Sequence, residues 1–237
     1  MDYALAVMAV LAKAGEFADL TSRFLGGLAP GDRGLILSAA KERRYPARAV
    51  ITRQDAPADE LFLLTHGHAR CFYTTRDGRK LLMMWAVPGD IFGGKALLPG
   101  PVSYVVSTET TRDSRFLVWD APAIRRLARQ HPQILENAIS IASDYLDWYL
   151  SAHLALTCHT ARQRLAEVLV CLARGIGHRV PGGVEFDVTN EELGSAANIT
   201  PFTASRLLNE WQRNRALVKR RGKLILRAPE RLFAGVD

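Results

Sequence analysis

Residues 189–227 read TNEELGSAANITPFTASRLLNEWQRNRALVKRRGKLILR, and their capping residues, turn and basic charges predict the fold of the C-terminal part of the chain. Thr189 and Glu192 have the spacing of a capping box, which predicts a helix from there to about Ala197. Thr200-Pro201 predicts the start of a second helix, because threonine caps well and proline suits the first helical position. Asn198 stands in the tight turn between them, where a residue that tolerates positive φ is needed.

A basic hairpin follows the second helix. Lys219-Arg220-Arg221-Gly222-Lys223 lies between the apolar segments 217–218 and 224–226. The segment from Arg213 to Arg227 contains no acidic residue, which suits contacts with phosphates. Two short helices, a turn and a hairpin in this order predict a winged helix-turn-helix.

The second helix should present a polar and cationic face to the major groove of DNA. Arg206 can donate two hydrogen bonds to guanine, whereas Phe202 can touch a thymine methyl group but accepts no hydrogen bond. A solvated basic face on an ordinary helical subdomain is the alternative interpretation. The predicted DNA contacts are Thr200, Phe202, Thr203, Ser205, Arg206, Asn209, Arg213, Arg220, Arg221 and Lys223.

The composition is that of an ordinary globular protein. The 237 residues are 48% apolar and 23% charged, with a net charge of +7 that favours an anionic partner. Cys71, Cys158 and Cys171 are too few for a disulfide scaffold and form no metal-binding pair, so we expect a cytoplasmic protein without a structural metal. Asp2 is the only charged side chain before the apolar run 4–12, whereas a signal peptide needs a positive charge there. We therefore interpret the run as an amphipathic helix rather than a signal peptide or membrane span.

The segment before residue 121 alternates short apolar runs with turns. The predicted strands are 49–52, 61–65, 69–74, 80–85 and 102–107, and this spacing is typical of a sandwich or small barrel. The pattern then becomes helical, with a short helix over 122–130. We divide the chain into an N-terminal helical extension (1–23), a β sensor domain (24–132), a long helix (133–158) and a DNA-binding domain (159–237).

The long helix has two apolar faces. One recurs every 3.5 residues from residue 135 to residue 156, which predicts a coiled-coil seam between two copies of the chain. A second stripe, Ile134, Ile141, Trp148 and Ala155, would pack on the chain's own sandwich. Burial of the whole helix within one domain is the alternative. The predicted dimer contacts are Leu135, Ile139, Ala142, Leu146, Tyr149 and His153.

The chain from about Phe24 onward resembles the cyclic-AMP receptor protein and fumarate-nitrate regulator (Crp/Fnr) superfamily of bacterial transcription factors. The resemblance rests on the segments 58–64, 88–93, 188–194 and 205–208, and on Gly67 and Asp77-Gly78. It implies an α+β protein with a jelly-roll, cyclic-nucleotide-binding-like sensor, a dimerisation helix and a winged helix that binds a palindromic promoter site. Double-stranded DNA, a second copy, RNA polymerase and a small-molecule effector are the partners it implies, with no membrane and no enzyme activity.

The sequence departs from the cyclic-nucleotide members of this family at the sensor. Gly94 stands where they place a glutamate, Tyr104 stands near the place of their arginine, and a phosphate would lose its bidentate partner. We therefore expect an effector other than cyclic AMP, or none. The resemblance places the effector pocket at Phe92, Gly93, Gly94, Lys95, Tyr104, Tyr149 and Leu150.

Three other functions remain as alternatives. A haem-based gas sensor could use His66, His68 and Cys71, although we predict no cofactor and His-x-His with a nearby cysteine is a weak pattern. A cyclic-nucleotide-responsive regulator with a divergent pocket is the second alternative, and a nucleotide-binding module without a DNA role is a third. We do not expect a metal-dependent jelly-roll enzyme, because the chain lacks the carboxylate and the distant histidine that such a metal site requires. The oxygen-sensing type is excluded because no cysteine precedes Cys71.

Overall fold

The computed structural model describes residue 17, residues 20–220 and residues 222–233. The predicted N-terminal helix and Arg221 therefore lie outside the described residues. The chain forms two compact units, one within residues 1–74 and 84–146 and the other within 75–83 and 147–237. None of the described helices combines the length and the hydropathy needed to cross a lipid bilayer.

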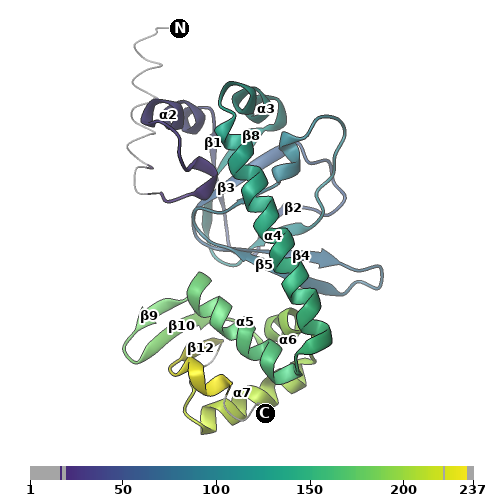
Figure 1. The fold of residues 1–237 in the computed structure, drawn as a ribbon, viewed down its shortest axis with the longest axis vertical. Helices are drawn as coiled ribbons and strands as arrows, with labels where there is room; N and C mark the ends of the chain where they lie inside the picture. Colours follow the sequence, from purple (N-terminus) through teal and green to yellow (C-terminus); the bar gives the residue numbers. More distant parts are fainter. Residues whose placement is uncertain (1–16, 18–19, 221, 234–237) are drawn as a thin grey trace. The chain divides into compact units, whose positions relative to one another are not determined.

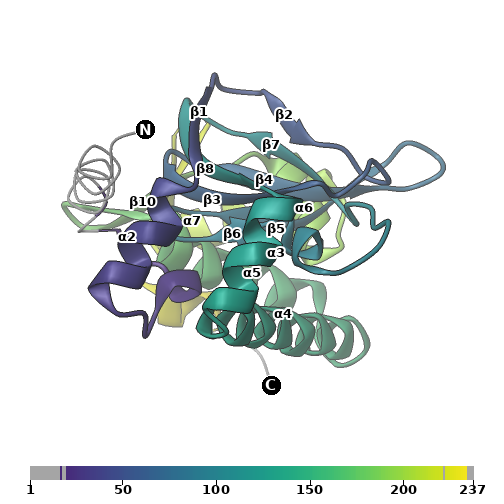
Figure 2. The ribbon, with the colours of Figure 1, turned by 90° about the horizontal axis from the view of Figure 1, so that it is seen from above.

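The first unit contains the β domain except residues 75–83, which belong to the second unit (Figure 1). One sheet has the order β1-β8-β3-β6 and the other β2-β7-β4-β5. Figure 2 shows β8 between β1 and β3. The strands are β1 (Lys41–Tyr45), β2 (Val50–Thr52), β3 (Glu60–His66), β4 (Ala69–Thr74), β5 (Lys80–Ala86), β6 (Ile91–Phe92), β7 (Ser107–Thr110) and β8 (Ser114–Asp120).

The strand predictions for β2, β3, β4 and β5 are confirmed, but the one for 102–107 is wrong. Only Ser107 of that run belongs to a strand. The rest of the run bonds with another loop instead of with a strand: the backbone of Ala58 donates to the carbonyl of Val102, and the backbone of Tyr104 donates to the carbonyl of Ala56. The sequence pattern also missed β8, which is central and buried, and β1, whose sequence KERRY is mostly charged.

The core lies on both faces of the sheet that contains β3. Leu61, Leu63 and Trp119 are buried on one face, and the indole of Trp119 donates to the carbonyl of Ile36 over 2.8 Å. On the other face the ring of Phe62 stacks on that of Phe92, with centroids 4.9 Å apart. Alternating side chains of one strand therefore contribute to two clusters, as a buried strand requires.

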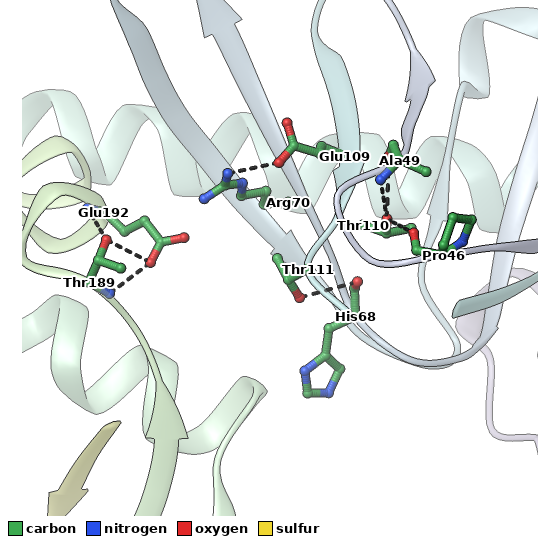
Figure 3. Close-up of polar contacts among 9 residues, drawn as sticks. All are labelled: Pro46, Ala49, His68, Arg70, Glu109, Thr110, Thr111, Thr189 and Glu192. Carbon is green, nitrogen blue, oxygen red and sulfur yellow. Dashed lines mark hydrogen bonds and ion pairs between the residues drawn. The ribbon is translucent and has the colours of Figure 1, made fainter. Parts of the chain in front are cut away.

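A threonine fixes the turn between β1 and β2. The hydroxyl of Thr110 on β7 donates to the carbonyl of Pro46 over 2.6 Å and accepts from the backbone of Ala49 over 2.9 Å (Figure 3). Thr110 is fully buried, and these bonds satisfy its hydroxyl.

Helices cover the first sheet. They are the 3-10 helix Arg23–Leu25, α2 (Pro30–Ser38), the 3-10 helix Gly94–Leu97, α3 (Ala121–Gln130) and α4 (Gln133–Cys158). Asp120 caps α3 by accepting from the backbone of Ala123. Ile134 is buried in the core, and Ala138 and Ile141 pack against it. The first half of α4 therefore packs on the β domain through one face, as predicted for Ile134 and Ile141, whereas Trp148 of the same predicted stripe is 45% exposed.

The second unit is a winged helix-turn-helix. Its helices are α5 (Ala161–Gly175), α6 (Asn190–Ala197), α7 (Pro201–Arg213) and the 3-10 helix Pro229–Leu232. Its sheet has the order β11-β12-β10-β9, with β9 (His178–Val180), β10 (Gly183–Asp187), β11 (Leu217–Arg220) and β12 (Lys223–Leu226). The indole of Trp211 donates to the carbonyl of Leu232 inside the core. The predicted order of helices and hairpin is confirmed.

Candidate nucleic-acid interface and effector pocket

A reciprocal capping box begins α6. The backbone of Thr189 donates to Oε2 of Glu192 over 2.8 Å, and the backbone of Glu192 donates to Oγ1 of Thr189 over 3.2 Å (Figure 3). The helix ends at Asn198, with φ 49° and ψ 54°. The turn brings the backbone of Ile199 so close to Gly194 that a Cβ on Gly194 would stand 2.9 Å from the carbonyl oxygen of Ile199. These contacts fix where α7 begins.

Helix α7 has two faces of opposite character. Thr200 caps it by accepting from the backbone of Thr203, and the hydroxyls of the two threonines lie 2.9 Å apart. Ala204, Leu207, Leu208 and Trp211 form the buried face. The opposite stripe has the helical spacing i, i+4, i+7 and i+11, and all its side chains are exposed. This stripe, called the reading face below, consists of Phe202, Arg206, Asn209 and Arg213.

The single acid of α7 is held by a cation. Arg162 of α5 donates to Oε1 of Glu210 over 2.5 Å and lies over the ring of Trp211, 5.4 Å from its centroid. The hydrogen bond from Arg162 lowers the pKa of Glu210, and the charges of Arg206 and Arg213 lower it further. Glu210 therefore stays ionised, but its charge is offset and it opposes an anionic ligand little.

The wing holds its basic residues in different ways. Lys219 donates to Oδ1 of Asn209 over 2.9 Å. Lys223 donates to Oε1 of Glu185 over 2.8 Å and lies 3.7 Å from Asp187, and the bond with Glu185 raises the pKa of Lys223. Arg220 is exposed. Of the two predicted wing contacts that the structure describes, Arg220 is thus the more accessible to a ligand, because Lys223 is already paired with Glu185.

The sequence did not indicate Arg164. Its guanidinium donates to the carbonyl of Ala197 over 2.8 Å, to that of His159 over 2.6 Å and to that of Asn198 over 3.4 Å. Arg164 therefore joins the end of α6 and its turn to the segment that follows α4. An arginine inside a helix gives no pattern by which this role could be predicted.

The first unit has a small pocket beside the turn after β6. Its volume is about 140 Å³. The residues that line it are Thr52, Phe92, Gly93, Gly94, Lys95, Tyr104, Val105, Val106 and Thr108. The structure thus brings together five of the predicted effector residues. The other two, Tyr149 and Leu150, belong to the second unit, where they are exposed on α4.

Tyr104 is tied to the backbone of β3. Its hydroxyl donates to the carbonyl of Glu60 over 3.0 Å and accepts from the backbone of Glu60 over 3.2 Å, and burial raises the pKa of Tyr104 to about 12. Gly93 permits this approach, because at φ 76° a Cβ would stand 2.5 Å from the same carbonyl oxygen. Lys95 is the one charged side chain among the pocket-lining residues described. A neutral phenol, whose hydroxyl is bonded to the backbone of Glu60, therefore stands near the position of the family's arginine.

Charged groups near β7 are paired within the β domain. Arg70 donates to Oε1 of the buried Glu109 over 2.8 Å (Figure 3). The carbonyl of His68 accepts from the hydroxyl of Thr111 over 3.3 Å, while Cys71 is buried with its sulfur 3.4 Å from the hydroxyl of Thr108. Within residues 20–220 and 222–233, no three His, Cys, Asp or Glu side chains form a group suited to a metal, so His66, His68 and Cys71 do not form such a site.

The predicted dimer contacts are exposed along α4. Leu135 is 40% exposed, Ile139 61% and Leu146 68%, which is unusual for large apolar side chains. Ala142, Tyr149 and His153 are exposed as well.

Comparison with known protein families gives one match for the β domain and one for the helix-turn-helix. Residues 42–131 match the family model of the cyclic nucleotide-binding domain, and residues 163–234 match the Crp-like helix-turn-helix domain. The chain is 30% identical to the cyclic AMP receptor protein of Thermus thermophilus over 186 residues, which are 77% of this chain and 82% of that protein.

Two further proteins extend the similarity. The chain is 24% identical to the CRP-like cAMP-activated global transcriptional regulator of Mycobacterium tuberculosis over 92% of this chain and 93% of that one. The structure of FixK2 from Bradyrhizobium japonicum has the same fold, with a TM-score of 0.70, 24% identity, and coverage of 81% of this chain and 95% of that one. The chain therefore belongs to the Crp/Fnr family of transcription regulators, whose members are DNA-binding proteins and not enzymes.

Proposed function

We propose that the protein is a homodimeric regulator that binds a palindromic promoter site and responds to an effector other than cyclic AMP, or to none. One observation carries the DNA-binding part: α7 buries its apolar face and exposes the reading face, with Arg206 and Arg213 one above the other. Such a helix fits the major groove, where guanidinium groups reach base edges and phosphates. A regulator of this kind would act in the cytoplasm together with RNA polymerase.

The exposed stripe of α4 supports the dimer. Leu135, Ile139 and Leu146 are large, apolar and exposed in the single chain, although the same helix buries Ile134 against its own core. A second α4 packed along this stripe would remove these side chains from water. Two copies related by a two-fold axis would present two α7 helices, and a palindromic site has the matching symmetry.

The pocket supports the effector part of the proposal. A cyclic nucleotide carries a phosphate, and a buried phosphate needs charge-assisted donors. Gly94 offers no side chain, Tyr104 spends its hydroxyl on the backbone of Glu60, and Lys95 is exposed. Among the described residues that line the pocket, Lys95 is thus the one cation that could hold the phosphate of a cyclic nucleotide. Titration calorimetry with cyclic AMP should therefore show no binding at micromolar concentrations. Micromolar binding would reject this part alone.

Selection of bound duplexes from random DNA tests the main proposal. We expect an inverted repeat whose half-sites lie about one helical turn apart, roughly 10 base pairs. Binding to the selected duplex should weaken steeply as salt increases, because cations on the protein release counterions from the phosphates.

A pair of variants makes the test specific to α7. Arg213→Ala should weaken duplex binding, whereas Arg179→Ala removes the same charge from the exposed surface of β9 and should leave binding close to that of the wild type. Failure to select any sequence, or equal effects of the two variants, would contradict binding through the reading face. Selected sites without a repeat would contradict the palindrome.

A further inference from the structure

The most exposed large apolar side chain among the described residues is Phe202, at 79%. It is the second residue of α7 and lies on the reading face, one turn before Arg206. Burial of Ala204, Leu207, Leu208 and Trp211 holds the helix in place without any contribution from Phe202. Its phenyl ring therefore contributes little to the fold while it is exposed to water.

Several polar groups beside Phe202 already have partners within the same unit. Thr200 and Thr203 use their hydroxyls in the cap of α7. The side-chain oxygen of Asn209 already accepts from Lys219. Phe202 and Arg206 thus remain as the two most exposed large groups at the start of the reading face, one apolar and one cationic.

We propose that Phe202 determines sequence specificity by contacting the 5-methyl group of a thymine in each half-site. This inference rests on the proposed DNA binding. In the major groove the thymine methyl is the one apolar feature of a base pair, and an aromatic side chain is a suitable contact for it. Arg206 and Arg213 follow Phe202 along the same exposed stripe of α7, so this face of the helix attracts the phosphates of DNA.

The helix geometry also gives the distance to the base read by Arg206. Four residues of α-helix rise about 6 Å, and neighbouring bases on one strand are about 3.4 Å apart. The thymine should therefore lie within about two base pairs of the position whose preference is lost in Arg206→Ala.

The experiment uses the duplex selected by the full-length protein, with its thymines replaced one at a time by deoxyuridine. This replacement removes the methyl group and keeps every hydrogen-bonding group of the base. Each replacement at the thymine that Phe202 contacts should cost the wild type about fourfold in affinity, which corresponds to one buried methyl group. Replacing the two symmetry-related thymines together should cost about sixteenfold. Phe202→Ala changes both half-sites, so it should bind the thymine duplex about as weakly as the wild type binds the doubly replaced duplex, and it should not distinguish the two.

Two further variants serve as controls. Phe233→Ala removes another exposed phenyl ring of the same unit and should keep the wild-type response to uridine. Phe202→Leu should keep part of that response, because leucine is also apolar. Thermal unfolding of Phe202→Ala should match that of the wild type, which separates a binding defect from a folding defect.

The proposal is overturned if the wild type is indifferent to uridine at every position, or if Phe202→Ala still distinguishes thymine from uridine. An equal loss on all sequences would make Phe202 a contact to the DNA backbone and would overturn it as well. If the wild type selects no duplex at all, the proposed function itself fails, and this outcome is recognised before any uridine is introduced.

Discussion

At the scale of single residues, Asn198 shows how one backbone conformation sets the geometry of the DNA-binding unit. It ends α6 with φ 49°, in a region that is unfavourable for most L-residues. We expect Asn198→Ala to lower the free energy of unfolding by about 1 kcal/mol, whereas Asn198→Gly should change it by only a few tenths. Urea unfolding of the three proteins would measure this, and equal stability of the alanine and glycine variants would contradict a strained turn.

The cations of the interface should divide into two kinds. Arg206→Ala should cost about 1–3 kcal/mol per half-site and relax the preference at one base position. Arg220→Ala should weaken binding to all duplexes alike and reduce the salt slope by about one per half-site. Lys223→Ala should have a smaller effect than Arg220→Ala, because Glu185 already holds the ammonium group. Salt titrations on selected and random duplexes would show whether the two arginines differ; an unchanged motif in Arg206→Ala would make it a phosphate contact.

Cys71 gives a prediction about pH. Burial raises the pKa of its thiol from 9.0 to about 11. Between these pH values the unfolded chain loses the proton while the folded chain keeps it, so the contribution of this group to stability declines as pH rises through that window.

At pH 8 a thiol reagent should leave Cys71 unmodified in the folded protein and modify it after denaturation, while the exposed Cys171 reacts in both. Mass spectrometry of the labelled peptides would decide, and early labelling of Cys71 would reject its burial.

At the scale of elements, α4 combines two apolar faces in one helix. We expect Leu146→Arg to place a charge in the seam between two copies and to give monomers in sedimentation velocity. Ser151→Arg places the same charge on a different face of α4 and should leave the dimer intact. A dimer of unchanged strength in Leu146→Arg, or dissociation of both variants, would contradict this seam.

The elements also differ in how well the sequence predicted them. Helices α4, α6 and α7 follow from apolar spacing and capping residues, which are local signals. The central strand β8 was missed because its role depends on pairing with β1 and β3, which are distant in the sequence. The run 102–106 resembles a strand in composition, yet its backbone bonds with the loop at Asp55 to Ala58 instead of with a neighbouring strand. Long-range pairing thus overrode local preference.

At the scale of the whole molecule, the family and the order of its parts could be predicted, but the state of individual side chains could not. The reading face follows from helical spacing once the start of α7 is known. The pairing of Lys223 with Glu185 and the link from Arg164 to His159 depend on how separate segments pack, which spacing does not encode. The same holds for Tyr104, which the sequence marked as a departure from the family and as a pocket residue, and which the structure shows bonded to the backbone of Glu60.

The division of α7 into a buried face and a reading face has a consequence for how this lineage can diverge. The residues that hold the helix in place and those that would meet DNA are different residues, and Phe202 and Arg206 contribute little to the core. Substitutions on the outer stripe are therefore expected to be nearly neutral for folding, typically within about 0.5 kcal/mol. After gene duplication, one copy could acquire a new operator preference through a few such changes while its fold remained intact.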